Sequence, residues 1–209
     1  MMSGMKYRLL HLPAMALAVG LFLVPAAHAA TSNPGQPVVM LDNALISIMK
    51  SASANVSFQA RYQQLAPVIE QSYDLPLVTQ NSVGFLWSTL SVAQQKELVD
   101  LFTQFTISSY VSQFNGYSGQ TLAVQPGTKA LGQKQIVVTQ LSSTDGNSVQ
   151  IDYLMGKVGE DWKINDVLLN GTISQVAVHA SDFASLVKSG DASKLISALQ
   201  AKIKILQDG

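Results

Sequence analysis

Apolar residues recur every three or four positions within residues 90–120, near the middle of the chain. This spacing places them on one face of a helix. The face comprises Leu98, Leu101, Phe102, Phe105 and Ser109, and Val111 and Phe114 widen it. We therefore predict one long helix that is apolar on more than one side and that needs cover from several other elements.

Polar residues mark both ends of this predicted helix. Ser91 has the position of an N-cap, and Gln94 follows three residues later, which is the pattern of a capping box. Asn115 and Gly116 predict the end of the helix, because glycine readily adopts the left-handed conformation in which many helices end.

Three shorter helices are predicted before the long one. The first two begin at Pro37 and Phe58 and are separated by residues 51–57. Pro67 predicts a break or restart near the middle of the second helix, because proline removes a backbone donor. The third is short and begins after Asp74.

The period of the pattern changes from helical to alternating after Gly119. Residues 135–141, 149–155 and 162–168 read as strands, and residues 121–124 read as a short edge strand. We predict a curved antiparallel sheet of three to four strands from this pattern.

Two helices are predicted after the sheet, over residues 173–188 and after Asp191, which caps the last one. Helices first, strands next and helices last is the order of an α+β fold. An overly apolar helix that faces a sheet is typical of a protein that binds an apolar molecule. A fully packed core has the same periodicity, so the pattern leaves both arrangements open.

The first 29 residues have the features of an export signal. Lys6 and Arg8 precede an apolar segment over residues 14–24, and Ala27-His28-Ala29 is a small-x-small cleavage motif. We expect cleavage after Ala29, which leaves 180 of the 209 residues as a single domain over residues 30–209. The expected location is outside the cytoplasm.

Composition excludes several classes of function. Without Lys6 and Arg8 the chain has 11 basic and 13 acidic residues and no basic run, so we expect no nucleic-acid partner. The absence of cysteine excludes disulfides and thiol catalysis. His179 is the only histidine after the signal, so no histidine-based metal cluster is expected, and a Ser-His-Asp triad would require it. We expect no catalytic residues and no cofactor.

Asp152 and Asp166 are the remaining candidates for acid–base chemistry. They could pair on neighbouring strands, but their alternation with Ile151 and Tyr153 predicts that they lie on a solvated face. Asp152 and Tyr153 are adjacent on one strand, so they point to opposite faces and cannot share a pocket. An enzyme would need another acid inside the fold, such as Asp166.

A series of motifs in order carries a family resemblance. The motifs are Gly84-Phe85-Leu86-Trp87, Leu90-Ser91 with Gln94-Gln95, Phe102-x-x-Phe105 with Tyr110, Asp161-Trp162-Lys163-Ile164-Asn165-Asp166-Val167, and Ser181-Asp182-Phe183. Together they resemble the MlaC, or toluene-tolerance, family of periplasmic phospholipid-binding proteins. Residues 114–119 and 170–175 look closest to the branch called HpnM, which is associated with hopanoid biosynthesis.

This resemblance implies a lipid-sized apolar cavity between a curved antiparallel sheet and helices. It implies a periplasmic lipid carrier, not an enzyme, that shuttles a phospholipid or hopanoid-type lipid between the inner and outer membranes. The implied partners are an inner-membrane ABC-transporter complex and an outer-membrane lipoprotein or transporter. His179-Ala180 stands where phospholipid carriers often have a basic residue, and this departure favours a nearly neutral polycyclic lipid.

Ten apolar and aromatic residues are candidates for lining the cavity. They are Trp87, Leu101, Phe102 and Phe105 from helices, Ile136, Val138, Ile151, Tyr153 and Leu168 from strands, and Val176 near the exit. Two alternatives remain open beside a lipid carrier. One is a small-molecule enzyme on a cone-shaped α+β fold, and the other is a ligand-free adaptor in an envelope complex.

Overall fold

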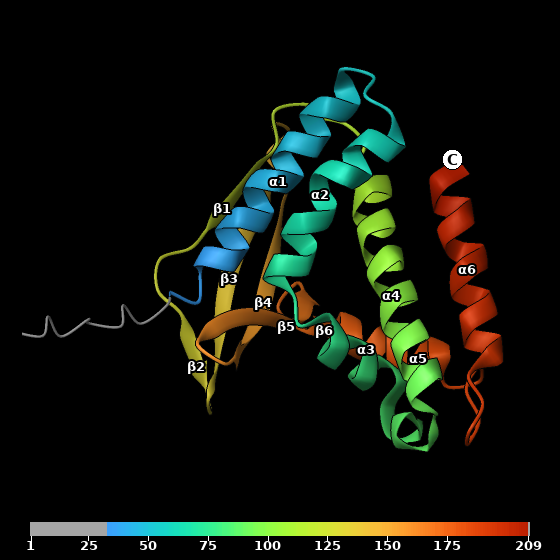
Figure 1. Cartoon of the computed structure of the whole chain (residues 1–209). Helices are drawn as coiled ribbons and strands as arrows, with labels where there is room; N and C mark the ends of the chain where they lie inside the picture. The colour runs from blue at the N-terminus through green and yellow to red at the C-terminus, as the bar shows by residue number, and fades with distance from the viewer. Residues whose placement is uncertain (1–32, 209) are drawn as a thin grey trace, which may run out of the picture. The chain divides into compact units, whose positions relative to one another are not determined.

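The computed structural model describes residues 33–208 and has an α+β fold (Figure 1). The helices are α1 (Gln36–Ser53), α2 (Phe58–Ser72), α3 (Leu75–Val83), α4 (Val92–Gln113), α5 (Gln175–Phe183) and α6 (Ser193–Asp208), and a 3-10 helix, η1 (Gly84–Thr89), joins α3 to α4. The predicted export signal and its cleavage site lie outside the described residues.

The sheet has six strands rather than the three to four that the sequence predicts. They are β1 (Thr121–Val124), β2 (Lys129–Leu131), β3 (Lys134–Ser142), β4 (Ser148–Val158), β5 (Asp161–Leu169) and β6 (Ile173–Ser174). Their order is β1-β3-β4-β5-β6, all pairs are antiparallel, and β2 also pairs with β3. The additional strands β2 and β6 have three and two residues, too few for an alternating pattern to be recognised.

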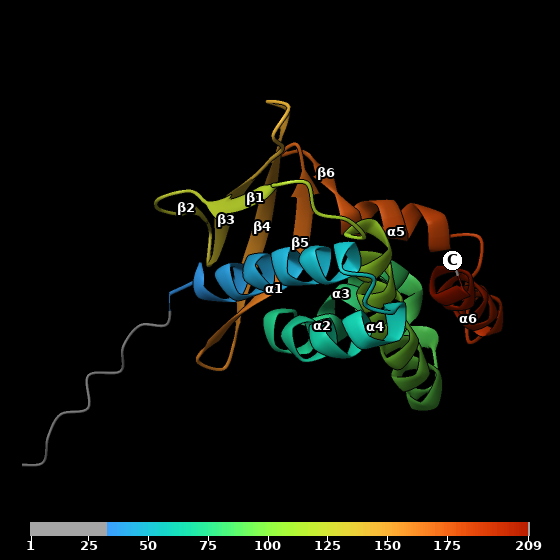
Figure 2. The same ribbon diagram turned by 90° about the horizontal axis from the view of Figure 1, so that it is seen from above.

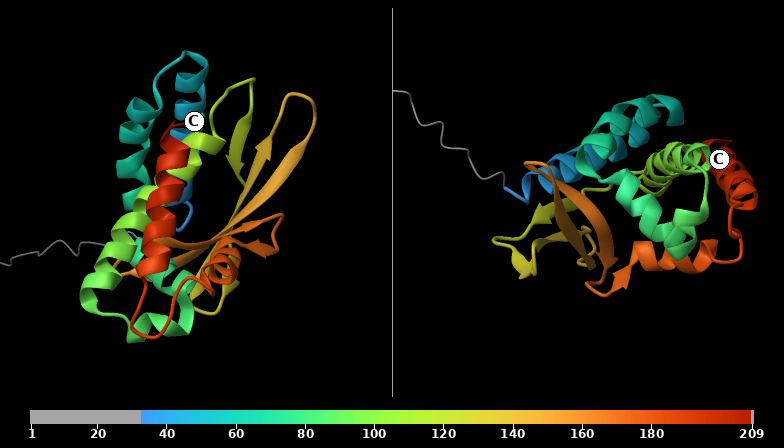
Figure 3. Two further views of the ribbon diagram at one scale, coloured as in Figure 1. Left: turned by 90° about the vertical axis from the view of Figure 1, so that its right-hand side faces the viewer. Right: turned by 60° about the horizontal axis from the view of Figure 1, so that its bottom comes forward.

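The helices α1, α2 and α4 lie on one side of the sheet (Figure 2). This side carries two cross-strand rows of residues, and residues that pair across strands share a face. The rows are Val137–Tyr153–Val167 and Thr139–Ile151–Leu169. The strands curve and twist strongly, so the sheet wraps partly around the helices (Figure 3). We call this the helix-facing side of the sheet.

The start of the long helix α4 is the one that the sequence predicts. The hydroxyl of Ser91 accepts a hydrogen bond from the backbone N–H of Gln94 at 3.2 Å, and the Gln94 side chain accepts one from the backbone N–H of Ser91 at 3.2 Å. The predicted end is wrong by two residues, because α4 ends at Gln113 and Gly116 does not adopt a positive φ. Phe114 takes the chain out of the helix instead, with its ring stacked on Tyr110 at 5.8 Å.

Two further predictions about helices are wrong. Pro67 does not break α2, which is continuous through the proline. The side chains of Leu65 and Ile69, on either side of Pro67, are completely buried, and this packing holds the helix together. The predicted helix over residues 173–188 is shorter, since Ser174 pairs with β5 and then caps α5 by accepting from the N–H of Ala177 at 3.0 Å. Tertiary pairing and packing decide both outcomes.

An acidic side chain, Asp42 of α1, is buried against the sheet with 4% of its surface exposed. The Thr139 hydroxyl donates a hydrogen bond to Asp42 Oδ2 at 3.2 Å, while Oδ1 has no partner within residues 33–208. Burial raises the pKa of Asp42 from 3.8 to about 7, against the opposing effect of the Thr139 hydrogen bond. The folded protein therefore favours the neutral acid.

We expect Asp42→Asn to stabilise the protein at pH 8 and to change its stability little at pH 4. The folded-state pKa lies above the ordinary value, so the contribution of Asp42 to stability is present below pH 3.8 and is lost as the pH rises through 7. Asparagine removes this loss, which is on the order of 4 kcal/mol for a shift of this size. Urea unfolding at the two pH values measures the difference, with the exposed Asp208→Asn as control. A difference between variant and wild type that does not grow with pH would contradict the prediction.

Candidate functional site

A cavity of about 210 Å³ lies between the helices and the helix-facing side of β4 and β5. α4 supplies one wall, α3 and Tyr73 supply the second, and the start of α5 supplies the third. Most of the wall is apolar, and Ile151, Val167 and Leu169 form its sheet side. The cavity is partly open to solvent, as a ligand entrance requires.

Aromatic rings from α4 and α5 pack together where these two helices border the cavity. The ring of His179 lies edge-on to Phe102 at 5.3 Å and to Phe105 at 5.8 Å, and it stacks on Phe183 at 5.6 Å. Burial lowers the pKa of His179, and the nearby carboxylates of Asp182 and Asp166 oppose this effect. The imidazole is therefore mostly neutral at pH 7, so it serves as part of an uncharged wall.

Three tyrosines place neutral polar groups beside the apolar surfaces. The hydroxyls of Tyr73 and Tyr110 share a hydrogen bond of 2.5 Å, and burial raises the pKa of Tyr110 to about 12. Burial also raises the pKa of Tyr73 and of Tyr153. These phenols remain protonated at physiological pH, so they bring no charge to the cavity.

Five of the candidate residues named from the sequence line the cavity: Phe102, Phe105, Ile151, Tyr153 and Val176. They come from α4, β4 and the first turn of α5, which the fold brings together. Contact between these residues and a ligand stays a prediction.

Three other candidates lie on the opposite side of the sheet. Val138 pairs with Asp152, and Asp152 with Leu168, whereas the cavity residue Ile151 belongs to the neighbouring row. Ile136 alternates with Val137 and so shares the side of Val138. The sequence therefore placed three candidates one residue out of register, and such a shift moves a side chain to the other face of the sheet. These candidates are Ile136, Val138 and Leu168.

The last two candidates, Trp87 and Leu101, pack against the core without lining the cavity. The carbonyl of Trp87 accepts a hydrogen bond from the Gln95 side chain at 2.9 Å, which ties η1 to the start of α4. α4 packs against α6 as well as α2 and α3, so its broad apolar surface serves several neighbours.

The sequence analysis places Ser109 on the apolar face of α4 but does not assign the polar residues of this helix to the cavity. Thr106, Ser109 and Gln113 continue the stripe of Phe102 and Phe105 at steps of three and four residues. Helical spacing could have identified them, had polar residues been allowed on the cavity face. Leu75 and Val78 of α3 carried no signal that distinguishes a cavity wall from ordinary core.

The two candidate carboxylates have structural partners. Asp152 is 6% exposed, so its predicted solvation is wrong, and Gln150 Nε2 donates to it at 2.8 Å. Gly171 packs so closely on this pair that an added Cβ would lie 3.1 Å from Gln150 Nε2. The turn at Gly171 therefore covers the carboxylate.

Asp166 lines the cavity, but its carboxylate fixes the start of α5. Asp166 Oδ1 accepts hydrogen bonds from the N–H groups of Val167 at 2.8 Å and Val176 at 3.1 Å, and Oδ2 accepts from the Ser174 hydroxyl at 2.5 Å. A carboxylate at a helix N-terminus is a stabilising arrangement. Residues 33–208 contain no cluster of three or more His, Cys, Asp or Glu that could hold a metal ion.

The sequence profile of the family described as MlaC protein matches residues 40–201 of this chain. No curated protein sequence matches the chain significantly. A similar solved structure is that of the phospholipid-binding protein from Ralstonia solanacearum in complex with a phospholipid, with a TM-score of 0.71 and 23% sequence identity. The alignment covers 84% of this chain and 99% of the Ralstonia chain, so the two share a fold over most of their lengths.

We expect Tyr110→Phe to lower the free energy of unfolding by about 1–3 kcal/mol, because it leaves the buried hydroxyl of Tyr73 without its partner. The double variant Tyr73→Phe/Tyr110→Phe should recover most of this loss, since it removes both polar groups. Urea unfolding of the wild type, both single variants and the double variant measures the coupling. If the double variant instead lost the sum of the two single-variant free energies, the two hydroxyls would not depend on each other for stability.

Proposed function

Because the chain belongs to the MlaC family, as the match over residues 40–201 shows, we propose that it is a periplasmic carrier of a phospholipid or a hopanoid-type lipid. The observation that carries the proposal is the partly open apolar cavity of about 210 Å³ between the sheet and the helices. The Ralstonia protein with the same fold, solved in complex with a phospholipid, supports it.

The physical task of such a carrier is to keep hydrocarbon out of water. Each CH₂ group removed from water contributes about 0.8 kcal/mol, so even part of one acyl chain in the cavity supplies substantial affinity. No bond of the lipid has to change, which agrees with a binding protein rather than an enzyme. The raised carboxyl pKa belongs to Asp42, which does not line the cavity, so it does not favour catalysis there.

The size of the cavity sets a condition on the complete ligand. Pockets that enclose drug-sized ligands have volumes of about 300–1,000 Å³. At 210 Å³ the cavity accommodates part of a hydrocarbon chain, so a lipid with two chains requires a larger cavity than the one in this structure. The ligand would be held mainly by apolar contact.

The polar groups of the cavity favour a lipid whose headgroup needs no cation. No Lys or Arg is among the residues that line it, considering the part of the chain that the structure describes. Asp166 is engaged at α5, and the neutral groups of Ser109, Gln113 and Gln175 remain to contact a ligand. A zwitterionic phospholipid and a hopanoid both meet this condition. We propose shuttling between the inner and outer membranes, with an ABC-transporter complex and an outer-membrane protein as partners.

Among residues 33–208, no helix has both the length and the apolar character that a membrane span needs.

We expect Val176→Trp to remove most of the bound lipid, because the larger side chain fills the cavity at α5. Val138→Trp is the matched control, since Val138 is half-buried on the opposite side of the sheet. The measurement is organic extraction of protein purified gently from its native host, followed by mass spectrometry of lipid per protein. Wild type and control should carry about one lipid each, and the mass identifies a phospholipid or a hopanoid. Wild-type protein that is empty after this purification would refute the proposed function.

A further inference from the structure

One phenol of the sheet reaches the cavity with its hydroxyl unpaired. Tyr153 of β4 lines the cavity, and its side chain is 1% exposed. Its hydroxyl has no hydrogen-bond partner among residues 33–208, yet it is not sealed in the core as the unpaired oxygens of Ser82 and Ser108 are. The small accessible surface of this hydroxyl therefore belongs to the cavity.

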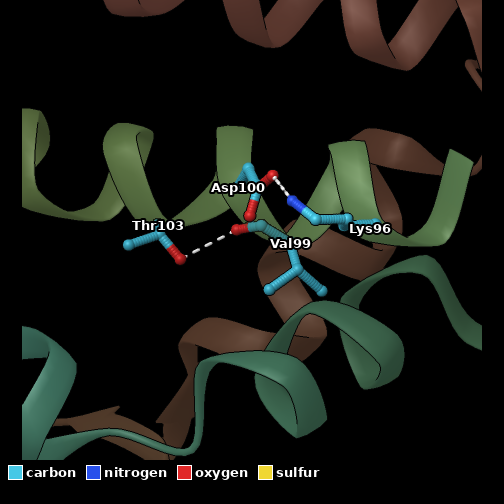
Figure 4. Close-up of polar contacts among 4 residues, drawn as sticks. All are labelled: Lys96, Val99, Asp100 and Thr103. Carbon is cyan, nitrogen blue, oxygen red and sulfur yellow. Dashed lines mark hydrogen bonds and ion pairs between the residues drawn. The ribbon is translucent and has the colours of Figure 1, made fainter. Parts of the chain in front are cut away.

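The hydroxyls of α4 differ from that of Tyr153, because their own helix supplies an acceptor. The Thr106 hydroxyl, on the cavity wall, donates to the carbonyl of Phe102 at 2.8 Å. Thr103 donates in the same way to the carbonyl of Val99 at 2.8 Å (Figure 4). A phenol on a strand has no such acceptor, since its hydroxyl lies at the far end of a ring and the strand carbonyls bond to neighbouring strands. Tyr153 thus keeps a donor that the fold leaves unused.

Tyr153 offers this donor without charge. Burial raises the pKa of Tyr153, and the nearby Tyr110 and Asp42 act in the same direction. The hydroxyls of Tyr110 and Tyr73 bond to each other at 2.5 Å. No Lys or Arg lines the cavity in the part of the chain that the structure describes, so an anion there would lose its water without gaining a counter-charge. An uncharged acceptor oxygen therefore fits this donor best.

Tyr153 lies deep in the cavity. Its cross-strand neighbours Val137 and Val167 are 0% and 9% exposed, whereas Gln113 and Leu169 of the cavity wall are exposed. A ligand that fills the cavity to this depth covers the hydroxyl and excludes water from it. Plain hydrocarbon would then leave a buried donor unpaired, which weakens binding about tenfold or more.

We propose that the ligand carries an uncharged acceptor oxygen where it meets Tyr153, and that this hydrogen bond selects the ligand over plain hydrocarbon. Both proposed classes of lipid contain such an oxygen, as an ester carbonyl in a phospholipid or as a hydroxyl in a hopanoid alcohol. A site that donates a hydrogen bond discriminates strongly against an analogue without the acceptor, because the buried donor is left unpaired. The inference rests on the proposed function, since it specifies the cargo of the same cavity.

The test is uptake of two pairs of lipids by purified protein that has been freed of lipid, measured by native mass spectrometry. Diacyl phosphatidylcholine is compared with its dialkyl ether counterpart, which lacks the carbonyl oxygens, and a hopanoid alcohol is compared with the hydrocarbon hopane. The wild type should prefer the oxygenated member of one pair by about tenfold, and that pair identifies the source of the oxygen. Tyr153→Phe should abolish the preference by weakening binding of the oxygenated lipid alone.

The matched control is Tyr62→Phe, which should keep the preference of the wild type. It removes the hydroxyl of a half-buried tyrosine on α2 that does not line the cavity. Urea unfolding supplies a second readout. Because the Tyr153 hydroxyl has no partner in the protein, Tyr153→Phe should be at least as stable as the wild type. A clear loss of stability would show that the hydroxyl serves the fold, which overturns the proposal.

The uptake measurement separates this proposal from the carrier function. Equal uptake of both members of each pair by the wild type overturns the role of Tyr153 and leaves the carrier intact. A preference that survives in Tyr153→Phe also overturns it. Wild-type protein that takes up neither the phospholipids nor the hopanoids refutes the carrier function, and the proposal about its cargo fails with it.

Discussion

The register of β3, β4 and β5 determines what surrounds the cavity. Because side chains alternate between the two faces of a strand, this pairing directs Tyr153 and Ile151 toward the helices and Asp152 away from them. A shift by one residue would place the carboxylate of Asp152 against α4 and expose the tyrosine on the opposite side. Every apolar contact that α4 and α5 make with the sheet side of the cavity depends on this register of strand pairing.

The interior is polar in places but carries little charge. The phenols of Tyr73 and Tyr110 satisfy each other, burial keeps His179 mostly neutral, and Asp42 favours its protonated form up to about pH 7. Arg61, Asp152 and Asp166 are further ionisable groups, and each has hydrogen-bond partners that compensate its burial, including three for Asp166. A site of this kind attracts hydrocarbon without selecting an ionic headgroup, which is the behaviour expected of a carrier that must also release its ligand.

Local signals in the sequence predicted local features well. The capping box of Ser91 and Gln94 and the apolar stripe of α4 depend on neighbouring residues, and both are present in the structure. Features that depend on distant segments were not predictable in this way. Alternation in β3 cannot say whether Ile136 or Val137 faces the helices, because both are apolar and pairing with β4 decides. Likewise, the burial of Asp152 depends on the turn at Gly171, and Pro67 is tolerated because α2 is held by its packed neighbours.

Two of the three hydrogen bonds that Asp166 accepts come from Ser174 and Val176 at the start of α5, whereas His179 and Phe183, further along that helix, pack through their rings. The helix is thus fastened at one end and merely packed at the other. If an entering chain displaced this helix, the part held by packing alone would have to yield before the part that Asp166 holds by hydrogen bonds.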